Sequence, residues 1–226
     1  SQRQTAFLLL AFSSGLGWLL VPFGEATVLG DPAPDFWMPE ASVFFTSFTF
    51  PHFAAATSLM LLTFIGWHLA LRGKGIAPAL GAALSAFLLA WIHPFLLVPI
   101  YLVTAAYLAW QWFRHREVSW LGVGTLMLCV LVSLPVVAYI QFGVIAPNAA
   151  FQGWIDQNTL LSPNILAYLV GFGLLLPLAL VGAVQGLCGR NRLHLFILFW
   201  IGIGSLLLYA PVALQRRFAE GLEIPF

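Results

Sequence analysis

Charged residues are scarce in this sequence. Only 8% of its 226 residues are Asp, Glu, Lys or Arg, whereas a soluble domain usually carries about a quarter. Hydrophobic residues make up 61%, and the mean hydropathy is +0.95. This composition excludes an ordinary soluble domain and places the chain in a lipid bilayer.

Cysteine and the common catalytic motifs are also lacking. The two cysteines, Cys129 and Cys188, fall in the middle of one predicted span and at the end of another, so we expect no disulfide. The sequence contains no CxxC, HExxH or GxSxG, which leaves metal-dependent hydrolysis and a nucleophile elbow without support. We therefore predict no metal ligands. The GLG, GVG and GFG pieces lack the spacing of phosphate loops and are typical of close helix approach.

What the sequence does contain is apolar blocks of about 17–25 residues, the length that crosses a bilayer as a helix. They predict an all-α fold, a polytopic helical membrane protein with about seven transmembrane helices and short interfacial helices, in a single transmembrane domain over 1–226. The seven predicted spans are residues 5–23, 50–71, 76–92, 95–113, 118–141, 163–187 and 194–212.

Local signals refine the ends of some spans. The aromatic stretch VFFTSFTF suits the membrane interface, after which Thr49 is a candidate helix cap with Pro51 in the first turn. Ser162 and Pro163 have the same pattern before the sixth span, and Pro135 predicts a kink in the fifth.

Residues 76–113 must turn. As one straight helix this apolar stretch would be about 57 Å long, far more than a bilayer needs. His93-Pro94 is the natural turning point, because proline removes a backbone donor and disfavours helix at the preceding residue.

The charges segregate when the chain turns there. One set of connections carries the bases Arg3, Arg72, Lys74, Arg114, Arg116, Arg190 and Arg192, and the other carries the acids Glu25, Asp31, Asp35, Glu40 and Asp156. Basic loops stay cytoplasmic, so we expect a multi-pass inner-membrane protein whose N-terminal end is cytoplasmic and whose C-terminal end is not. His68, His115 and His194 then border the basic side, where we expect no chemical role.

Arg216 and Arg217 break this charge rule, since an odd number of spans puts them on the non-cytoplasmic side. One interpretation is an interfacial amphipathic helix whose arginines reach headgroups and pair with Glu220 and Glu223. The other is an anion site, because guanidinium fits phosphate bidentately.

Other polar residues are expected at the same depth in the membrane as Arg216 and Arg217. His52 begins one span and His93 marks a turn, and ionisable residues in membranes tend to be functional. The predicted substrate-binding set is His52, His93, Arg216, Arg217, Gln157, Asn158, Asp35 and Glu40.

The order of several motifs resembles a family of bacterial polytopic membrane proteins that look like the GT-C class of glycosyltransferases. The motifs are SGLGWLL, PDFWMPEASVF, FPHFAAATSLMLL, IHPFLLVPIYLVTAAY, GWIDQNTLLSPNILAYLVGFGLLLPLALVG and QRRFAEGLEIP. The resemblance covers nearly the whole chain. It implies transfer of sugar from a polyprenyl-phosphate carrier at the non-cytoplasmic face, with His52, His93, Gln157-Asn158 and Arg216-Arg217 lining the pocket.

The resemblance also implies what to expect beyond this chain. The class has its catalytic acids in a first outer loop, and in the similar proteins that loop precedes the segment matching 5–23. We therefore expect the catalytic residues upstream, a divalent metal only through residues outside this chain, and no activity from this piece alone. Expected partners are membrane lipid and the polyprenyl-phosphate carrier, with other membrane subunits as a further class and no nucleic acid.

Two alternatives stay open. The chain could be a non-catalytic subunit of a respiratory or photosynthetic complex that holds haem or chlorophyll through His52 or His93. It could also be a transporter built around the short span 76–92, although the second half of the sequence shows no matching broken helix.

Overall fold

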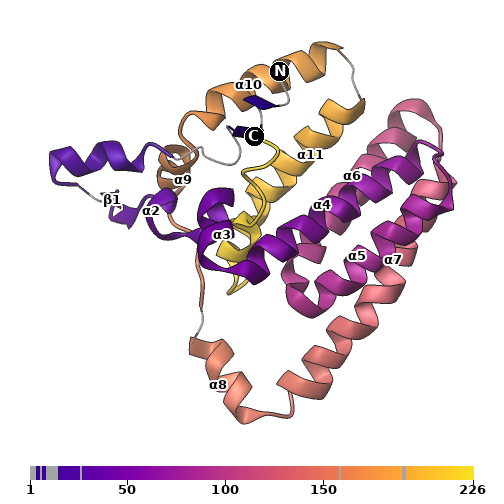
Figure 1. Ribbon diagram of the computed structural model, residues 1–226, viewed down its shortest axis with the longest axis horizontal. Helices are drawn as coiled ribbons and strands as arrows, with labels where there is room; N and C mark the ends of the chain where they lie inside the picture. The colour runs from indigo at the N-terminus through magenta and orange to yellow at the C-terminus, as the bar shows by residue number, and fades with distance from the viewer. Residues whose placement is uncertain (1–3, 6, 9–14, 26, 158, 190–191) are drawn as a thin grey trace. The chain divides into compact units, whose positions relative to one another are not determined.

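The computed structural model describes residues 4–5, 7–8, 15–25, 27–157, 159–189 and 192–226, and it is almost entirely helical (Figure 1). Within the described residues the sheet structure is one antiparallel hairpin, strands β1 (Thr27–Val28) and β2 (Asp31–Pro32). The predicted all-α class is confirmed.

Fewer helices than the expected seven have the length and composition to cross a membrane. In the described part of the chain three do: α4 (Pro51–Leu71), Pro94–His115 and Trp120–Ile145. A fourth is reached if the bent pair α9 (Ile165–Phe172) and α10 (Leu175–Gly189) counts as one span. Helices α5 (Ile76–Ile92) and α11 (Arg192–Leu207) are apolar but shorter. These helices fit a membrane protein.

The chain forms two compact units. Unit 1 contains residues 1–54 and 160–226, and unit 2 contains residues 55–159. Unit 2 is thus one continuous stretch, inserted in the sequence between the two parts of unit 1.

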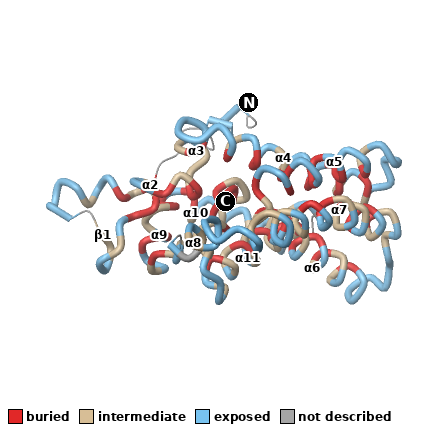
Figure 2. Tube along the Cα trace, turned by 90° about the horizontal axis from the view of Figure 1, so that it is seen from below, coloured by how far each residue is buried: buried red, intermediate tan, exposed pale blue. Residues whose placement is uncertain are grey.

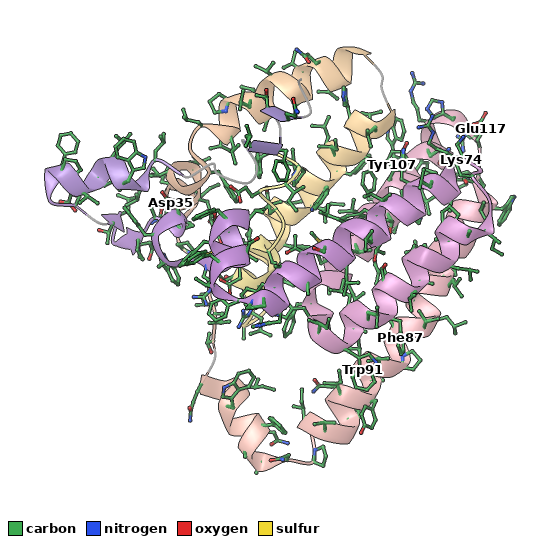
Figure 3. The ribbon with its side chains drawn as sticks, in the orientation of Figure 1. Asp35, Lys74, Phe87, Trp91, Tyr107 and Glu117 are labelled. Carbon is green, nitrogen blue, oxygen red and sulfur yellow. The ribbon has the colours of Figure 1, made fainter. Side chains whose placement is uncertain are left out.

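In unit 2, the predicted turn at His93 is confirmed. Helix α5 ends at Ile92, a single 3-10 turn η3 (Pro94–Leu96) follows, and α6 (Leu97–His115) runs back. Figure 3 shows Lys74 and Glu117 at one end of this unit and Phe87 and Trp91 toward the other. The basic connections before α5 and after α6 therefore share an end.

Small residues let the helices of unit 2 approach closely. Helix α5 packs mainly against α7 (Trp120–Ala138) and buries a row of alanines: Ala79, Ala82, Ala83, Ala86 and Ala90. At the basic end, the Trp67 indole of α4 donates to the Gly122 carbonyl at 3.0 Å, and Ser119 caps α7 by accepting from Gly122 N–H at 3.3 Å. In Figure 2 the buried residues gather where these helices face one another.

Helix α7 continues beyond Pro135 as the π-helix η4 (Tyr139–Ile145), without a break in the span. The short helix α8 (Ala149–Gln157) follows it. The structure thus prolongs the fifth expected span by a few residues past 141.

In unit 1, the described part of the first expected span, 5–23, differs from the prediction. Residues Gly17–Phe23 form the 3-10 helix η1, and Leu16 N–H donates to Val170 O at 2.8 Å. The following loop folds into the hairpin, the short helices α2 (Pro34–Trp37) and η2 (Pro39–Ala41), and α3 (Val43–Thr49). The Thr49 hydroxyl donates to Phe45 O within α3, at 2.7 Å, rather than capping the next helix.

The sixth expected span, 163–187, is broken. Helices α9 and α10 meet at 88°, and Gly173 between them has φ 47° and ψ −117°. Asn164, not Ser162, caps α9: its side-chain oxygen accepts from Ala167 N–H at 2.9 Å, while its amide donates to Asp31 at 2.9 Å. This cap ties the hairpin to α9.

Unit 1 has its own apolar core. It brings together the loop after the hairpin, α9 and the segment after α11. The buried members are Met38, Ala41, Tyr168, Phe172, Leu208, Phe218, Ala219 and Leu222. The 3-10 turn η5 (Gln215–Ala219) is therefore fixed against η2 by apolar burial.

Candidate functional site

The core of unit 1 carries a buried ion cluster. Glu40 of η2 places Oε1 at 2.9 Å from Arg217 Nη1 and 3.6 Å from Arg216 Nη2 of η5. The Glu40 side chain is 1% exposed, whereas the side chains of Arg216 and Arg217 are 18% and 22% exposed. The carboxylate is thus enclosed, and both guanidinium groups reach the surface.

Backbone pairing fixes the segment that carries the arginines. Leu160 N–H donates to Ala213 O at 2.7 Å, and Arg216 N–H donates to Leu160 O at 3.0 Å. The Gln215 side chain accepts from Ser162 N–H at 3.2 Å and donates to Ala210 O at 2.7 Å. The chain that enters α9 therefore holds η5 in place.

Aromatic faces support the two guanidinium groups. Arg216 Cζ lies 4.8 Å from the centroid of the Trp37 ring, and Arg217 Cζ lies 5.3 Å from that of Phe53. The His52 ring meets Phe53 edge to face at 4.5 Å. His52 is therefore next to the cluster, in the first turn of α4, and exposed.

The expected amphipathic helix does not form at Arg216 and Arg217. The arginines lie on a 3-10 turn and form ion pairs with Glu40, 177 residues away from Arg217. Glu220 and Glu223 are both buried, and Glu223 accepts a hydrogen bond from Val43 N–H at the start of α3. Glu40 thus connects η2 to η5, and Glu223 connects the segment after η5 to α3.

Two polar atoms of the cluster have unused bonding capacity. Glu40 Oε2 and Arg216 Nε are buried and have no hydrogen-bond partner among the described residues. A buried donor without a partner costs about 1–3 kcal/mol, and a ligand oxygen would recover part of it. Because two guanidinium groups share one carboxylate oxygen, they keep donors for a second anion.

Asp35, labelled in Figure 3, is held by a different element of unit 1. Its Oδ2 accepts from Gly17 N–H at 3.0 Å, and its Oδ1 is buried without a partner in the part of the chain that is described. Burial raises the pKa of this carboxyl, and the Gly17 hydrogen bond opposes that effect. Asp35 therefore fastens η1 to α2 and is not in contact with the arginines.

The remaining predicted site residues belong to unit 2. His93 is buried at the turn between α5 and α6, and its ring lies 5.9 Å from Phe95. Gln157 is exposed at the end of α8, and Asn158 lies outside the described residues. The structure brings together Glu40, His52, Arg216 and Arg217 from the predicted set.

Sequence reasoning missed the aromatic partners of this site. Trp37 lies between Asp35 and Glu40 in the same loop, and Phe53 follows His52, so both were next to residues already singled out. An arginine pair beside aromatic residues is a signal for stacking that could have identified them.

Within the described residues, no group of three or more His, Cys, Asp and Glu side chains is arranged to hold a metal ion. Comparison of the chain with protein-family models, curated proteins and solved structures gives no match. The chemistry of the site is therefore argued from its own geometry.

Proposed function

We propose that this chain is part of a membrane glycosyltransferase-like protein that binds the phosphate of a polyprenyl-phosphate sugar at Arg216 and Arg217. The observation that carries the proposal is that both guanidinium groups converge on one buried carboxylate oxygen while remaining partly exposed. Among these three groups, two positive charges meet one negative charge. Such a pair attracts a further anion, and guanidinium matches phosphate geometry.

In this proposal the arginines stabilise the negative charge that develops on the departing carrier phosphate. Glu40 orients both guanidinium groups and limits their rotamers, so it is a positioning residue. Trp37 and Phe53 exclude water from one face of each guanidinium group, which strengthens its interaction with an anion. His52, whose ring packs against Phe53, is the predicted residue that would hydrogen-bond a phosphate oxygen or an acceptor hydroxyl.

We further propose that the basic connections of unit 2 face the cytoplasm and that Arg216 and Arg217 face the opposite side of the inner membrane. The support for the first part is the distribution of charge within unit 2, where Arg72, Lys74, Arg114 and Arg116 all occupy one end. The loop after the hairpin, which contains Glu40 in η2, then shares a side with the arginines.

The test is binding of polyprenyl phosphate to the purified protein. We expect Arg216→Ala and Arg217→Ala each to weaken binding by about tenfold or more, because each removes a charge-assisted contact worth about 1.5–3 kcal/mol. Arg114→Ala is the matched control, since Arg114 is exposed in unit 2, and it should bind like the wild type.

The Glu40→Gln variant distinguishes an effect on phosphate binding from an effect on folding. It removes the carboxylate that competes for the arginines, so a protein that still folds should bind phosphate more tightly than the wild type. Circular dichroism and the melting temperature monitor the fold. Wild-type affinity in both arginine variants, with the fold intact, would reject the anion site.

A second candidate function is transport, and the 88° break between α9 and α10 favours it. Broken helices at membrane depth line substrate pathways in transporters. Uptake of labelled inorganic or sugar phosphate into proteoliposomes that contain the protein would support this candidate. Sugar transfer without uptake would reject it.

A further inference from the structure

The 3-10 helix η1 (Gly17–Phe23) is apolar, but by itself it is too short to cross a membrane. It contains no charged residue. At about 2 Å per residue its 7 residues extend about 14 Å, whereas the hydrocarbon of a bilayer is about 30 Å thick. Gly24 ends the helix in the left-handed region. The sequence of η1 therefore avoids water in a helix that does not reach across a bilayer.

The large apolar side chains of η1 are not covered by the rest of the described protein. Phe23 is 82% exposed, and the other exposed members are Trp18, Leu19 and Val21. Exposed apolar surface of this kind marks contact with lipid or with another protein. The composition of the whole chain, which is typical of a membrane protein, favours lipid.

The tip of the hairpin that follows η1 is apolar as well. Leu29 and Gly30 form the two-residue turn between β1 and β2, with φ of 51° and 89°. Turns with positive φ at both positions usually contain Asn-Gly or Asp-Gly, because other side chains are strained in the left-handed region. Leu29 is 80% exposed, so packing within the described residues does not account for a leucine there.

Hydrogen bonds fix η1 and the hairpin to α9. Leu16 N–H, just before η1, donates to Val170 O at 2.8 Å. On the hairpin, Val28 O accepts from the Asn164 side-chain amide at 2.6 Å. Because α9 belongs to the bent pair that gives the fourth candidate span, the exposed side chains of η1 and the hairpin tip are attached to an element with the composition of a membrane segment.

The backbone of η1 suits an apolar environment. Leu19 N–H donates to Leu16 O and Gly24 N–H donates to Val21 O, both at 3.0 Å, and Pro22 has no N–H to satisfy. A helix whose backbone donors are used internally can lie against hydrocarbon without the cost of unpaired polar groups.

The charges near η1 determine how it can attach to a bilayer. The sequence has no Lys or Arg between Arg3 and Arg72, so this region lacks a basic patch for anionic headgroups. Attachment then comes from apolar burial, which does not require anionic lipid. The exposed carboxylate of Glu25, directly after η1, limits the depth of insertion because its removal from water is costly.

We infer that η1 and the hairpin tip form a membrane anchor that inserts Trp18, Val21, Phe23 and Leu29 between the lipid headgroups and the acyl chains. Aromatic side chains concentrate at this boundary, and interfacial elements enter it by about 5–10 Å. The partner is the bilayer itself, without a preference for anionic lipid. The anchor is independent of the proposed function, since Arg216 and Arg217 take no part in it.

The test is the depth of a fluorescent label in phosphatidylcholine nanodiscs. In the full chain without Cys129 and Cys188, a cysteine at Phe23 or at Leu29 carries the dye NBD, and both side chains are exposed enough to be replaced without disturbing the fold. The lipid carries a nitroxide quencher either near the headgroup or near the end of the acyl chain. We expect the shallow nitroxide to quench both labels at least about twofold more than the deep one, with little quenching by aqueous iodide.

Two further positions calibrate the measurement. Leu62 is exposed near the middle of α4, a helix long enough to cross the membrane, so a label there should be quenched more by the deep nitroxide. Glu117 is exposed in the connection between α6 and α7, so a label there should be quenched by iodide. Circular dichroism should show the same helical content in all labelled proteins.

Each of three results at position 23 would overturn the anchor. Quenching by iodide as strong as at position 117 would place η1 in water. Stronger quenching by the deep nitroxide, as at position 62, would place it within a membrane-crossing segment. Protection from iodide and from both nitroxides would show that protein covers it. Carrier binding is not involved in any of these outcomes, so they leave the test of the arginine pair separate.

Discussion

Glu40 shows how a charged residue is tolerated in the core of unit 1. Removing a carboxylate from water costs several kcal/mol, which is repaid only by close partners and further hydrogen bonds. Arg217 at 2.9 Å and Arg216 at 3.6 Å supply those partners. Glu40 was grouped with the two arginines from the sequence because an odd number of predicted spans put both on one side of the membrane, although the described helices include fewer candidate spans than that count. The direct pairing was not predictable, since the partners are 177 residues apart.

Asp35 is a residue whose protonation should affect stability. Burial raises its pKa in the folded protein above the ordinary value of 3.8, so the folded state favours the protonated form. Its contribution to stability is complete below pH 3.8 and is lost as the pH rises through the folded pKa.

Asp35→Asn is neutral at every pH, and its amide oxygen can still accept from Gly17 N–H. We therefore expect Asp35→Asn to raise the melting temperature at pH 7 by a few degrees, with the difference from the wild type closing as the pH falls to 3.8. A variant that melts below the wild type at pH 7 would show that the charged form is the one preferred in the fold.

At the scale of elements, the sequence predicted one of two breaks in apolar stretches and missed the other. The turn after α5 was predicted because Pro94 removes a backbone donor. The break after α9 was missed because residues 163–187 are apolar throughout and its cause is a single glycine, Gly173. Glycine is common in membrane helices, so a positive φ at one of them cannot be recognised from hydropathy.

Gly173→Ala should test whether this break is required. With φ 47° and ψ −117°, an alanine is strained, and its Cβ would lie 2.9 Å from Leu16 N. We expect a loss of stability on the order of 2 kcal/mol, measured as a lower melting temperature in detergent.

Gly202→Ala is the control for that variant. Gly202 is in the helix α11 with open space around its Cα, so alanine there should raise stability by roughly 0.5–1 kcal/mol. Equal effects of the two substitutions would mean that α9 and α10 tolerate a continuous helix.

At the scale of the whole molecule, counting apolar residues overestimated the number of crossings. The first expected span contains the 3-10 helix η1, whose large apolar residues are mostly exposed. The last expected span shortens to α11, because the segment after α11 packs in the core of unit 1 instead of continuing as a helix. Hydropathy reports that a segment avoids water, but it does not distinguish lipid from protein as the apolar neighbour.

The arrangement of unit 2 predicts which connections share a side. In a protein without Cys129 and Cys188, cysteines placed at Lys74 and at Glu117 should react with an impermeant maleimide from the same side of sealed vesicles. A cysteine at Asn148, after the span Trp120–Ile145, should react from the opposite side. Labelling of positions 117 and 148 from one side would contradict this arrangement.

The order in which the two units are completed follows from the 177 residues between Glu40 and Arg217. A ribosome that adds 5–20 residues per second needs about 9–35 s to synthesise that interval. Unit 2 is finished within it, while Glu40 still awaits its counter-ions. The ion pairs of Glu40 therefore form only after unit 2 has been synthesised, and unit 1 is completed last.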